Sequence, residues 1–124
     1  MKIIKIGCII LIVVLVVLGF KNQKNFIETS PQDIYETIET CLDSMSFSKQ
    51  TLSSVLLVEG FTQKEINKAF SSLNINWKEQ AKLKAEQYLS LINLSEDGLR
   101  EQLKCEGFND EEINYAIKNI YLKE

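Results

Sequence analysis

The chain contains Glu59-Gly60-Phe61-Thr62-Gln63-Lys64-Glu65-Ile66-Asn67, and 47 residues later it contains Glu106-Gly107-Phe108-Asn109-Asp110-Glu111-Glu112-Ile113-Asn114. The correspondence extends without a gap over residues 32–73 and 79–120. Self-similarity at a fixed period indicates one supersecondary unit that is built twice. We therefore divide most of the 124-residue chain into repeat one, residues 31–75, and repeat two, residues 76–124.

Each repeat has the apolar spacing of three helices. Ser48 and Ser95 stand where N-caps of the second helices are expected, and Gly60 and Gly107 stand where those helices should end with positive φ. We predict an all-α fold of two tandem three-helix, helix-turn-helix-like repeats behind an N-terminal transmembrane helix. The expected helices span residues 32–45, 48–58, 62–74, 78–92, 95–105 and 109–121.

Further caps mark the first and third helices of each repeat. Ser30 precedes Pro31, which suits the first turn of a helix, and Asn76 stands three residues before Glu79. The third helices should open with capping boxes, and the residue pairs concerned are Thr62 with Glu65 and Asn109 with Glu112.

Aromatic residues predict how the repeats pack. One unit of 47 residues buries little apolar surface, so we expect the two repeats to pack together about residues 74–77. Trp77 is predicted to be a core residue at this junction. Phe61 and Phe108 directly follow the turn glycines, and we expect them to fix each turn by hydrophobic contact.

The amino-terminal residues 1–24 have the pattern of a membrane anchor. Lys2 and Lys5 precede a 15-residue apolar run over residues 6–20, and Lys21 and Lys24 follow it. Counted from Ile3, the run reaches 18 residues, which is long enough to cross a bilayer. We predict a single-pass signal-anchor over residues 1–24 and a polar linker over residues 25–30. The slight excess of positive charge before the run favours a soluble part on the outer side of the cell membrane.

Two alternatives remain for this segment. A cleaved signal peptide needs small residues at its cleavage site, and Val17-Leu18-Gly19 is a poor version of such a site. A lipoprotein needs a cysteine directly after the apolar run, whereas Cys8 stands near its start.

Composition excludes several classes of function. Beyond residue 24 there are ten Lys or Arg and all 17 Asp or Glu, a net charge of −7, which disfavours nucleic acid as a partner. The chain has no histidine, so Ser-His and Cys-His nucleophiles and His-based metal sites are impossible. We expect no enzyme, no metal, no cofactor and no small-molecule substrate. Cys41 has the spacing of a buried core residue, and a Cys41–Cys105 disulfide is conceivable but not favoured.

The surface charge differs between the repeats. Six acids cluster around the second helix and the following turn of repeat two, and we call them the acidic face: Glu96, Asp97, Glu101, Glu106, Asp110 and Glu111. The equivalent positions of repeat one are mostly neutral or basic, and Glu59 alone matches an acid, Glu106. These acids can be a solvated helix surface. The functional alternative is a binding site for a basic or amphipathic protein partner.

A family resemblance rests on spaced residues of repeat two. They are Leu94-Ser95, Gly98-Leu99, Gln102-Leu103, Glu106-Gly107-Phe108, Glu112-Ile113 and Tyr115-Ala116-Ile117, with Asn76-Trp77 and Ala81 before them. This pattern resembles the repeat of the Ltp-type host cell surface-exposed lipoproteins, and repeat one is a weaker version of it. Proteins of this family are carried by prophages or plasmids and displayed on Gram-positive cells.

The resemblance implies superinfection exclusion. A displayed module of this kind blocks injection of an incoming phage genome by binding the phage tape-measure protein. Two other functions fit the residues alone. One is a membrane-tethered helical adaptor for another protein, and the other is a helix-turn-helix DNA binder that faces the cytoplasm.

Overall fold

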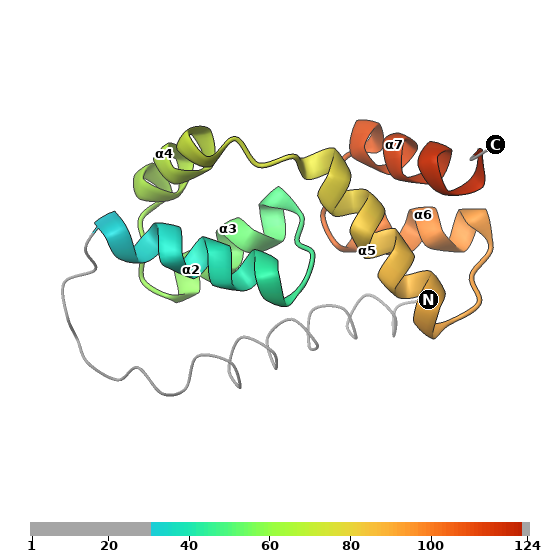
Figure 1. Ribbon diagram of the computed structural model, residues 1–124, viewed down its shortest axis with the longest axis horizontal. Helices are drawn as coiled ribbons and strands as arrows, with labels where there is room; N and C mark the ends of the chain where they lie inside the picture. The colour runs from blue at the N-terminus through green and yellow to red at the C-terminus, as the bar shows by residue number, and fades with distance from the viewer. Residues whose placement is uncertain (1–30, 123–124) are drawn as a thin grey trace.

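The computed structural model describes residues 31–122, and this part of the chain is entirely helical, without a strand. Figure 1 shows its six helices. They are α2 (Pro31–Ser44), α3 (Lys49–Val58), α4 (Gln63–Leu73), α5 (Trp77–Leu91), α6 (Glu96–Cys105) and α7 (Asp110–Tyr121). The all-α prediction is confirmed, and every predicted helix boundary agrees to within one residue.

The predicted membrane anchor, residues 1–24, and the linker, residues 25–30, lie outside the described residues, as does the proposed cap Ser30. Within residues 31–122, no helix combines the length and the apolar character that a membrane span requires.

Local hydrogen bonds explain where the helices begin. The hydroxyl oxygen of Ser48 accepts from the Thr51 N–H at 3.1 Å, and that of Ser95 accepts from the Gly98 N–H at 3.1 Å. Both predicted capping boxes of the third helices are present. The bonds that Thr62 donates hold the pKa of the Glu65 carboxyl below its ordinary value.

The start of α5 differs from the expectation. Asn76 caps the helix by accepting from the Glu79 N–H at 3.1 Å. The Glu79 carboxylate does not complete a capping box within residues 31–122. It instead accepts from Lys82 and from the Tyr115 hydroxyl, both at 3.3 Å. The Glu79 carboxylate therefore bonds to Lys82 of α5 and Tyr115 of α7 in place of the backbone N–H of Asn76.

The turn glycines have the predicted geometry. Gly60 has φ +104° and Gly107 has φ +97°, and both directly follow the C-cap residue of the preceding helix. The Phe61 N–H donates to the Leu56 carbonyl and the Phe108 N–H to the Leu103 carbonyl, each at 3.1 Å. Both phenylalanines are buried, so the prediction that they fix the turns is confirmed.

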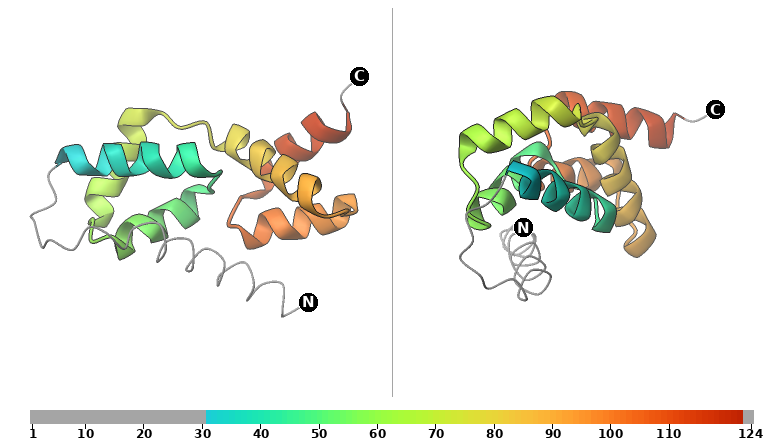
Figure 2. Two further views of the ribbon diagram at one scale, coloured as in Figure 1. Left: turned by 60° about the horizontal axis from the view of Figure 1, so that its bottom comes forward. Right: turned by 60° about the vertical axis from the view of Figure 1, so that its left-hand side comes forward.

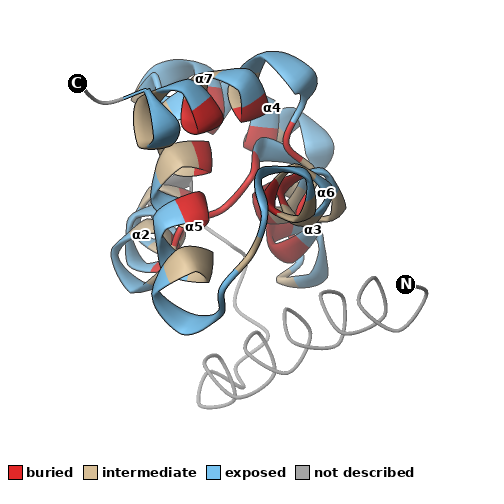
Figure 3. Ribbon diagram, turned by 90° about the vertical axis from the view of Figure 1, so that its right-hand side faces the viewer, coloured by how far each residue is buried: buried red, intermediate tan, exposed pale blue. Residues whose placement is uncertain are grey.

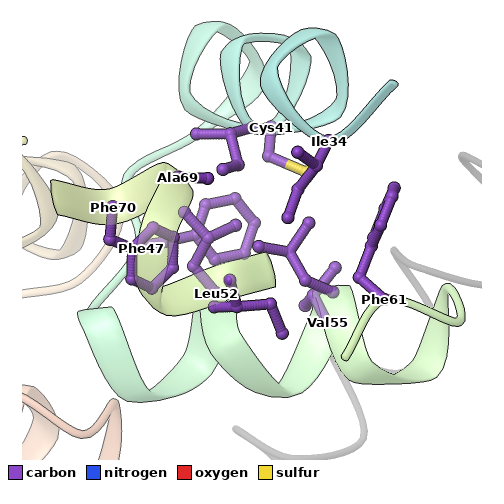
Figure 4. Packing of buried hydrophobic residues seen from close by; sticks show 11 residues of the cluster. Ile34, Cys41, Phe47, Leu52, Val55, Phe61, Ala69 and Phe70 are labelled. Atoms are coloured by element: carbon purple, nitrogen blue, oxygen red, sulfur yellow. The ribbon is translucent and has the colours of Figure 1, made fainter. Parts of the chain in front are cut away.

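Each repeat has its own hydrophobic cluster. Cluster one, shown in Figure 4, contains Ile34, Ile38, Cys41, Phe47, Leu52, Val55, Leu56, Phe61, Ile66, Ala69 and Phe70. Cluster two contains Ala81, Ala85, Leu99, Leu103, Phe108, Ile113, Ala116 and Ile117. The two clusters are separate, so repeat two contributes little apolar surface to the core of repeat one.

Trp77 is the exception to this separation. It is the first residue of α5, yet its ring packs against cluster one and meets the Phe70 ring edge to face, with centroids 5.1 Å apart. The prediction that Trp77 packs at the junction is confirmed, but its side chain is half-buried and lies against cluster one rather than within it. This contact fixes the start of repeat two to the core of repeat one.

The first and third helices pack more tightly in repeat two. Helices α5 and α7 form the most extensive helix pair of the described residues. Ala81 and Ala85 of α5 stand where repeat one has the larger Ile34 and Ile38 of α2. All four side chains are buried, so the smaller alanines allow the two backbones of repeat two to approach.

The repeats are arranged end to end, so that the carboxyl end of α6 meets the amino end of α3 (Figures 1 and 2). The hydroxyls of Ser48 and Thr51 both donate to the backbone carbonyl of Glu106, at 2.5 and 2.6 Å. A Cβ atom added to Gly107 would lie 2.9 Å from the Ser48 hydroxyl oxygen, whereas one added to Gly60 would meet nothing within 4 Å. Gly107 is therefore required both for its backbone conformation and for close contact between the repeats.

This difference predicts unequal effects of the same substitution in the two turns. Gly60→Ala should lower the free energy of unfolding by about 1–2 kcal/mol, because alanine is strained at positive φ. Gly107→Ala should cost more, because its methyl group also collides with Ser48 and Gln50. Thermal unfolding of the full chain, followed by circular dichroism, measures both losses. Equal losses would show that the contact at Gly107 contributes nothing to stability.

Candidate partner-binding surface

Five of the six acids of the acidic face lie on the surface of repeat two. Glu96, Asp97 and Glu101 are exposed on α6, and Asp110 and Glu111 are exposed in the first turn of α7. Figure 3 views the molecule from the side of repeat two and shows exposed residues around the start of α6. The structure therefore places these five acids in the first turns of two helices and on the outer side of α6.

Three of these acids form ion pairs with nearby bases. Arg100 lies 3.3 Å from Glu96, and longer-range pairs join Lys78 to Glu111 at 2.9 Å and Lys104 to Asp110 at 3.7 Å. All three acids keep at least half of their side-chain surface exposed, so solvent screens these pairs and each contributes about 0–1 kcal/mol. They leave the carboxylates accessible to solvent.

Asp97 and Glu101 make no ion pair with any residue between 31 and 122. Asp97 lies in the first turn of α6, where a negative charge stabilises the helix dipole. Glu101 lies beyond that turn, so its charge is not explained by capping.

Glu106 does not belong to the exposed face, and its assignment as a partner-binding residue is corrected. Its side chain is 4% exposed, and its carboxylate accepts a hydrogen bond from the Tyr88 hydroxyl. Its backbone carbonyl accepts from repeat one, as described above. Glu106 therefore has a structural role inside repeat two and between the repeats.

The equivalent pair in repeat one is Cys41 and Glu59. Cys41 is buried in cluster one, and burial, with a smaller contribution from the charge of Glu59, raises the pKa of its thiol to about 11. Burial also raises the pKa of the Glu59 carboxyl. At neutral pH the Cys41 thiol therefore stays protonated and unreactive. Cys41 and Cys105 are not joined to each other, so the disulfide considered above is not formed.

Two further polar contacts join the repeats. The Phe47 N–H donates to the side-chain oxygen of Gln80 at 3.1 Å, and the side-chain amide of Gln87 donates to the Ser46 hydroxyl at 3.4 Å. Both glutamines lie on α5. They satisfy polar groups of the loop before α3, which would otherwise lose water without gaining a partner.

An open groove of about 350 Å³ runs beside this interface. Its lining residues come from α3, from α4, from the turn before α7 and from the first turn of α7: Lys49, Gln50, Ser53, Gln63, Asn67, Phe70, Gly107, Asn109 and Glu112. Amide and hydroxyl side chains dominate, with one base and one acid. Within residues 31–122, no group of three or more Cys, Asp or Glu is arranged to hold a metal ion.

Sequence reasoning did not identify the interface residues Ser48, Thr51 and Gly107 as contacts between repeats. Ser48 and Gly107 have identical counterparts in Ser95 and Gly60. Residue type alone therefore could not show which of the two serines, or which of the two glycines, contacts the other repeat. The exchange of Thr51 for Gly98 was the available signal, because the second hydroxyl donor is needed only where a carbonyl is bound.

Residues 76–120 match the family of host cell surface-exposed lipoproteins. The match begins at the cap of α5 and ends in α7, so it covers all three helices of repeat two and confirms the resemblance. No curated protein and no solved structure matches the chain. The acidic face lies on the repeat that matches this family. Tyr88, Glu106 and Gly107 also lie within the matched residues.

The bond between the Tyr88 hydroxyl and the buried Glu106 predicts a loss of stability when the hydroxyl is removed. Tyr88→Phe leaves the Glu106 carboxylate without that donor and should lower the free energy of unfolding by about 1–3 kcal/mol. Tyr115→Phe is the matched control, because it removes a longer, 3.3 Å bond to the partly exposed Glu79 and should cost less. Denaturant unfolding of the full chain measures both. A Tyr88→Phe loss no larger than the control would contradict a structural role for this bond.

Proposed function

We propose that this protein is a membrane-anchored, surface-displayed binding module that excludes superinfecting phage. In this proposal it blocks genome injection by binding the tape-measure protein of the incoming phage. The match of residues 76–120 to the family of host cell surface-exposed lipoproteins is the observation that carries the proposal.

The surface of repeat two supports a protein partner of basic or amphipathic character. Five exposed carboxylates gather on α6 and the start of α7, and two of them, Asp97 and Glu101, have no ion-pair partner within residues 31–122. Charges of one sign raise the association rate of an oppositely charged partner. Binding rather than catalysis is proposed, because the sequence has no histidine with which a Ser-His or Cys-His nucleophile could be built.

Display on the outer side of the cell membrane is part of the proposal. The family name implies a surface-exposed protein, and the apolar run over residues 6–20 supplies a means of anchoring. A transmembrane anchor and a lipid anchor would place repeat two at the same surface.

The adaptor and the DNA binder remain alternatives. An adaptor for another membrane protein would use the same exposed helices. A DNA binder is disfavoured by the net charge of −7 beyond residue 24. The third helices offer only Lys64 and Lys68 in repeat one and Lys118 in repeat two, whereas a DNA reader needs a basic recognition helix.

The proposal predicts that expression in a phage-sensitive host blocks injection and leaves adsorption unchanged. Adsorption is measured from the unbound phage, and injection from the phage DNA inside the cells. Protease treatment of intact protoplasts should remove the residues beyond 30 if the repeats face outward. Reduced adsorption with normal injection per bound particle, or full protection from protease, would contradict the proposal.

The acidic face should be required for exclusion. We expect weaker exclusion when its five exposed acids are neutralised together as Glu96→Gln, Asp97→Asn, Glu101→Gln, Asp110→Asn and Glu111→Gln. Loss of electrostatic attraction should slow partner association by about tenfold at low salt. Helicity should change little, because exposed charges each contribute about 1 kcal/mol or less.

The matched control removes five exposed acids elsewhere on α2 and α5: Asp33→Asn, Glu36→Gln, Glu39→Gln, Asp43→Asn and Glu86→Gln. It changes net charge equally and should retain exclusion. Undiminished exclusion by a folded, displayed variant of the acidic face would show that these acids serve only solvation.

A further inference from the structure

One end of repeat one carries two exposed apolar side chains. Val58, the last residue of α3, is 77% exposed, and Leu57 before it is 46% exposed. Neither side chain belongs to cluster one or to the residues that pack against it. The turn that follows is open as well, because a Cβ atom added to Gly60 would meet nothing within 4 Å. Packing within repeat one therefore does not explain why these two positions are apolar.

The corresponding positions of repeat two are not both apolar. Lys104 and Cys105 are the counterparts of Leu57 and Val58, and Lys104 is exposed. The fold of a repeat therefore accepts a charged side chain at this place. The apolar pair is a property of repeat one and not of the repeat in general.

The charge of the turn differs in the same direction. Gln63 and Lys64 begin α4, whereas Asp110 and Glu111 begin α7, and all four side chains are exposed. Two acids at this place would be repelled by the phosphates of lipid headgroups. One neutral residue and one base would not be. The turn of repeat one is thus both more apolar and less acidic than its counterpart.

This turn lies at the end of repeat one where the chain arrives from the predicted membrane anchor. Figure 1 and the left view of Figure 2 show the start of α2, the end of α3 and the start of α4 together, at the end of the molecule away from repeat two. The predicted anchor ends at residue 24, and the six residues 25–30 can extend at most about 20 Å. An anchor at residues 1–24 would therefore keep the turn close to the membrane surface.

We propose that the turn between α3 and α4 contacts the lipid surface through Leu57 and Val58. The inference rests on the membrane anchoring in the proposed function. Two side chains bury too little apolar area to bind a free protein stably, but a tether raises their effective concentration at the surface, so that a small contact suffices. Glu59 and Glu65 outnumber Lys64 at this turn, so the contact is apolar rather than electrostatic and should be insensitive to salt.

Lipid contact at this end would orient the other repeat. The two repeats are arranged end to end, so repeat two extends away from the turn (Figure 1). Repeat two also carries the exposed acids of the acidic face, which lipid phosphates repel. The repeat that matches the family of surface-exposed lipoproteins would then face away from the membrane.

A second exposed apolar pair provides a matched control. Leu91, the last residue of α5, is 81% exposed, and Ile92, its C-cap residue, is 48% exposed. The end of α5 lies at the opposite end of the molecule from the start of α2 (Figure 1). This pair therefore has a similar apolar exposure but is placed far from the anchored end.

The test measures how close each end of the full chain lies to lipid headgroups. The chain is placed in nanodiscs of phosphatidylcholine and phosphatidylglycerol that include a lipid with gadolinium bound to its headgroup, and backbone amide signals are followed by NMR. The signals of residues 57–64 should lose several-fold more intensity than those of residues 89–93. This difference should be the same at low and at high salt.

Two double variants separate lipid contact from mere tethering. Leu57→Gln with Val58→Gln should restore the signals of residues 57–64 several-fold, because the apolar contact is lost while the anchor remains. Leu91→Gln with Ile92→Gln should leave those signals unchanged. Both variants should keep their helicity by circular dichroism, since neither pair belongs to a hydrophobic cluster.

Three results would overturn the lipid contact. Equal signal loss at residues 57–64 in the unaltered chain and in the Leu57, Val58 variant would show that the tether alone brings the turn near the surface. Stronger loss at residues 89–93 would place repeat two against the membrane instead. Shifts of the residue 57–64 signals that appear only in discs holding two chains would assign this surface to a second copy.

In each of these three cases the chain remains anchored, so the proposed function stands. Release of the full chain from the discs would overturn both the membrane anchor and the lipid contact. Absence of phage exclusion by a chain whose turn does contact lipid would overturn the proposed function alone.

Discussion

The relative placement of the two repeats depends on one backbone carbonyl, that of Glu106. As the C-cap residue of α6, Glu106 has a carbonyl that no later turn of its own helix can satisfy. Repeat one satisfies it twice, through the hydroxyls of Ser48 and Thr51. Those hydroxyls sit at the amino end of α3, so the bond also aligns two helix dipoles. The glycine that follows, Gly107, allows the approach because a side chain there would collide with Ser48.

The remaining contacts support this bond. Trp77 reaches from the first turn of α5 into the core of repeat one, and Gln80 and Gln87 bind the loop that precedes α3. The Tyr88 hydroxyl holds the carboxylate of Glu106, the same residue whose carbonyl crosses to repeat one. The side chain and the backbone of Glu106 therefore face different parts of the molecule, and burial of the first orients the second.

Local structure could be predicted from the sequence because its determinants are local. Caps such as Thr62 with Glu65, and the glycines at positive φ, act within one turn of the chain. The interface could not be predicted in this way, because Ser48 and Ser95 are identical and only one of them meets a second helix. Glu106 was misplaced on the acidic face for the same reason, since its burial depends on Tyr88, 18 residues earlier.

The two repeats share the pattern of their cores and turns and differ at the start of their second helices. The residues that shape each core and each turn are shared between the repeats. The helix start that is neutral or basic in repeat one holds repeat two, and the equivalent start in repeat two is acidic and exposed. If repeat two had the equivalents of Lys49 and Gln50 at the start of its second helix, a further repeat could bind there in the same way. Head-to-tail contacts of this kind can continue as an open filament where they do not close a ring. Glu96 and Asp97 replace this start with two exposed negative charges in repeat two. The same two positions therefore distinguish a helix start that contacts the other repeat from one that faces solvent.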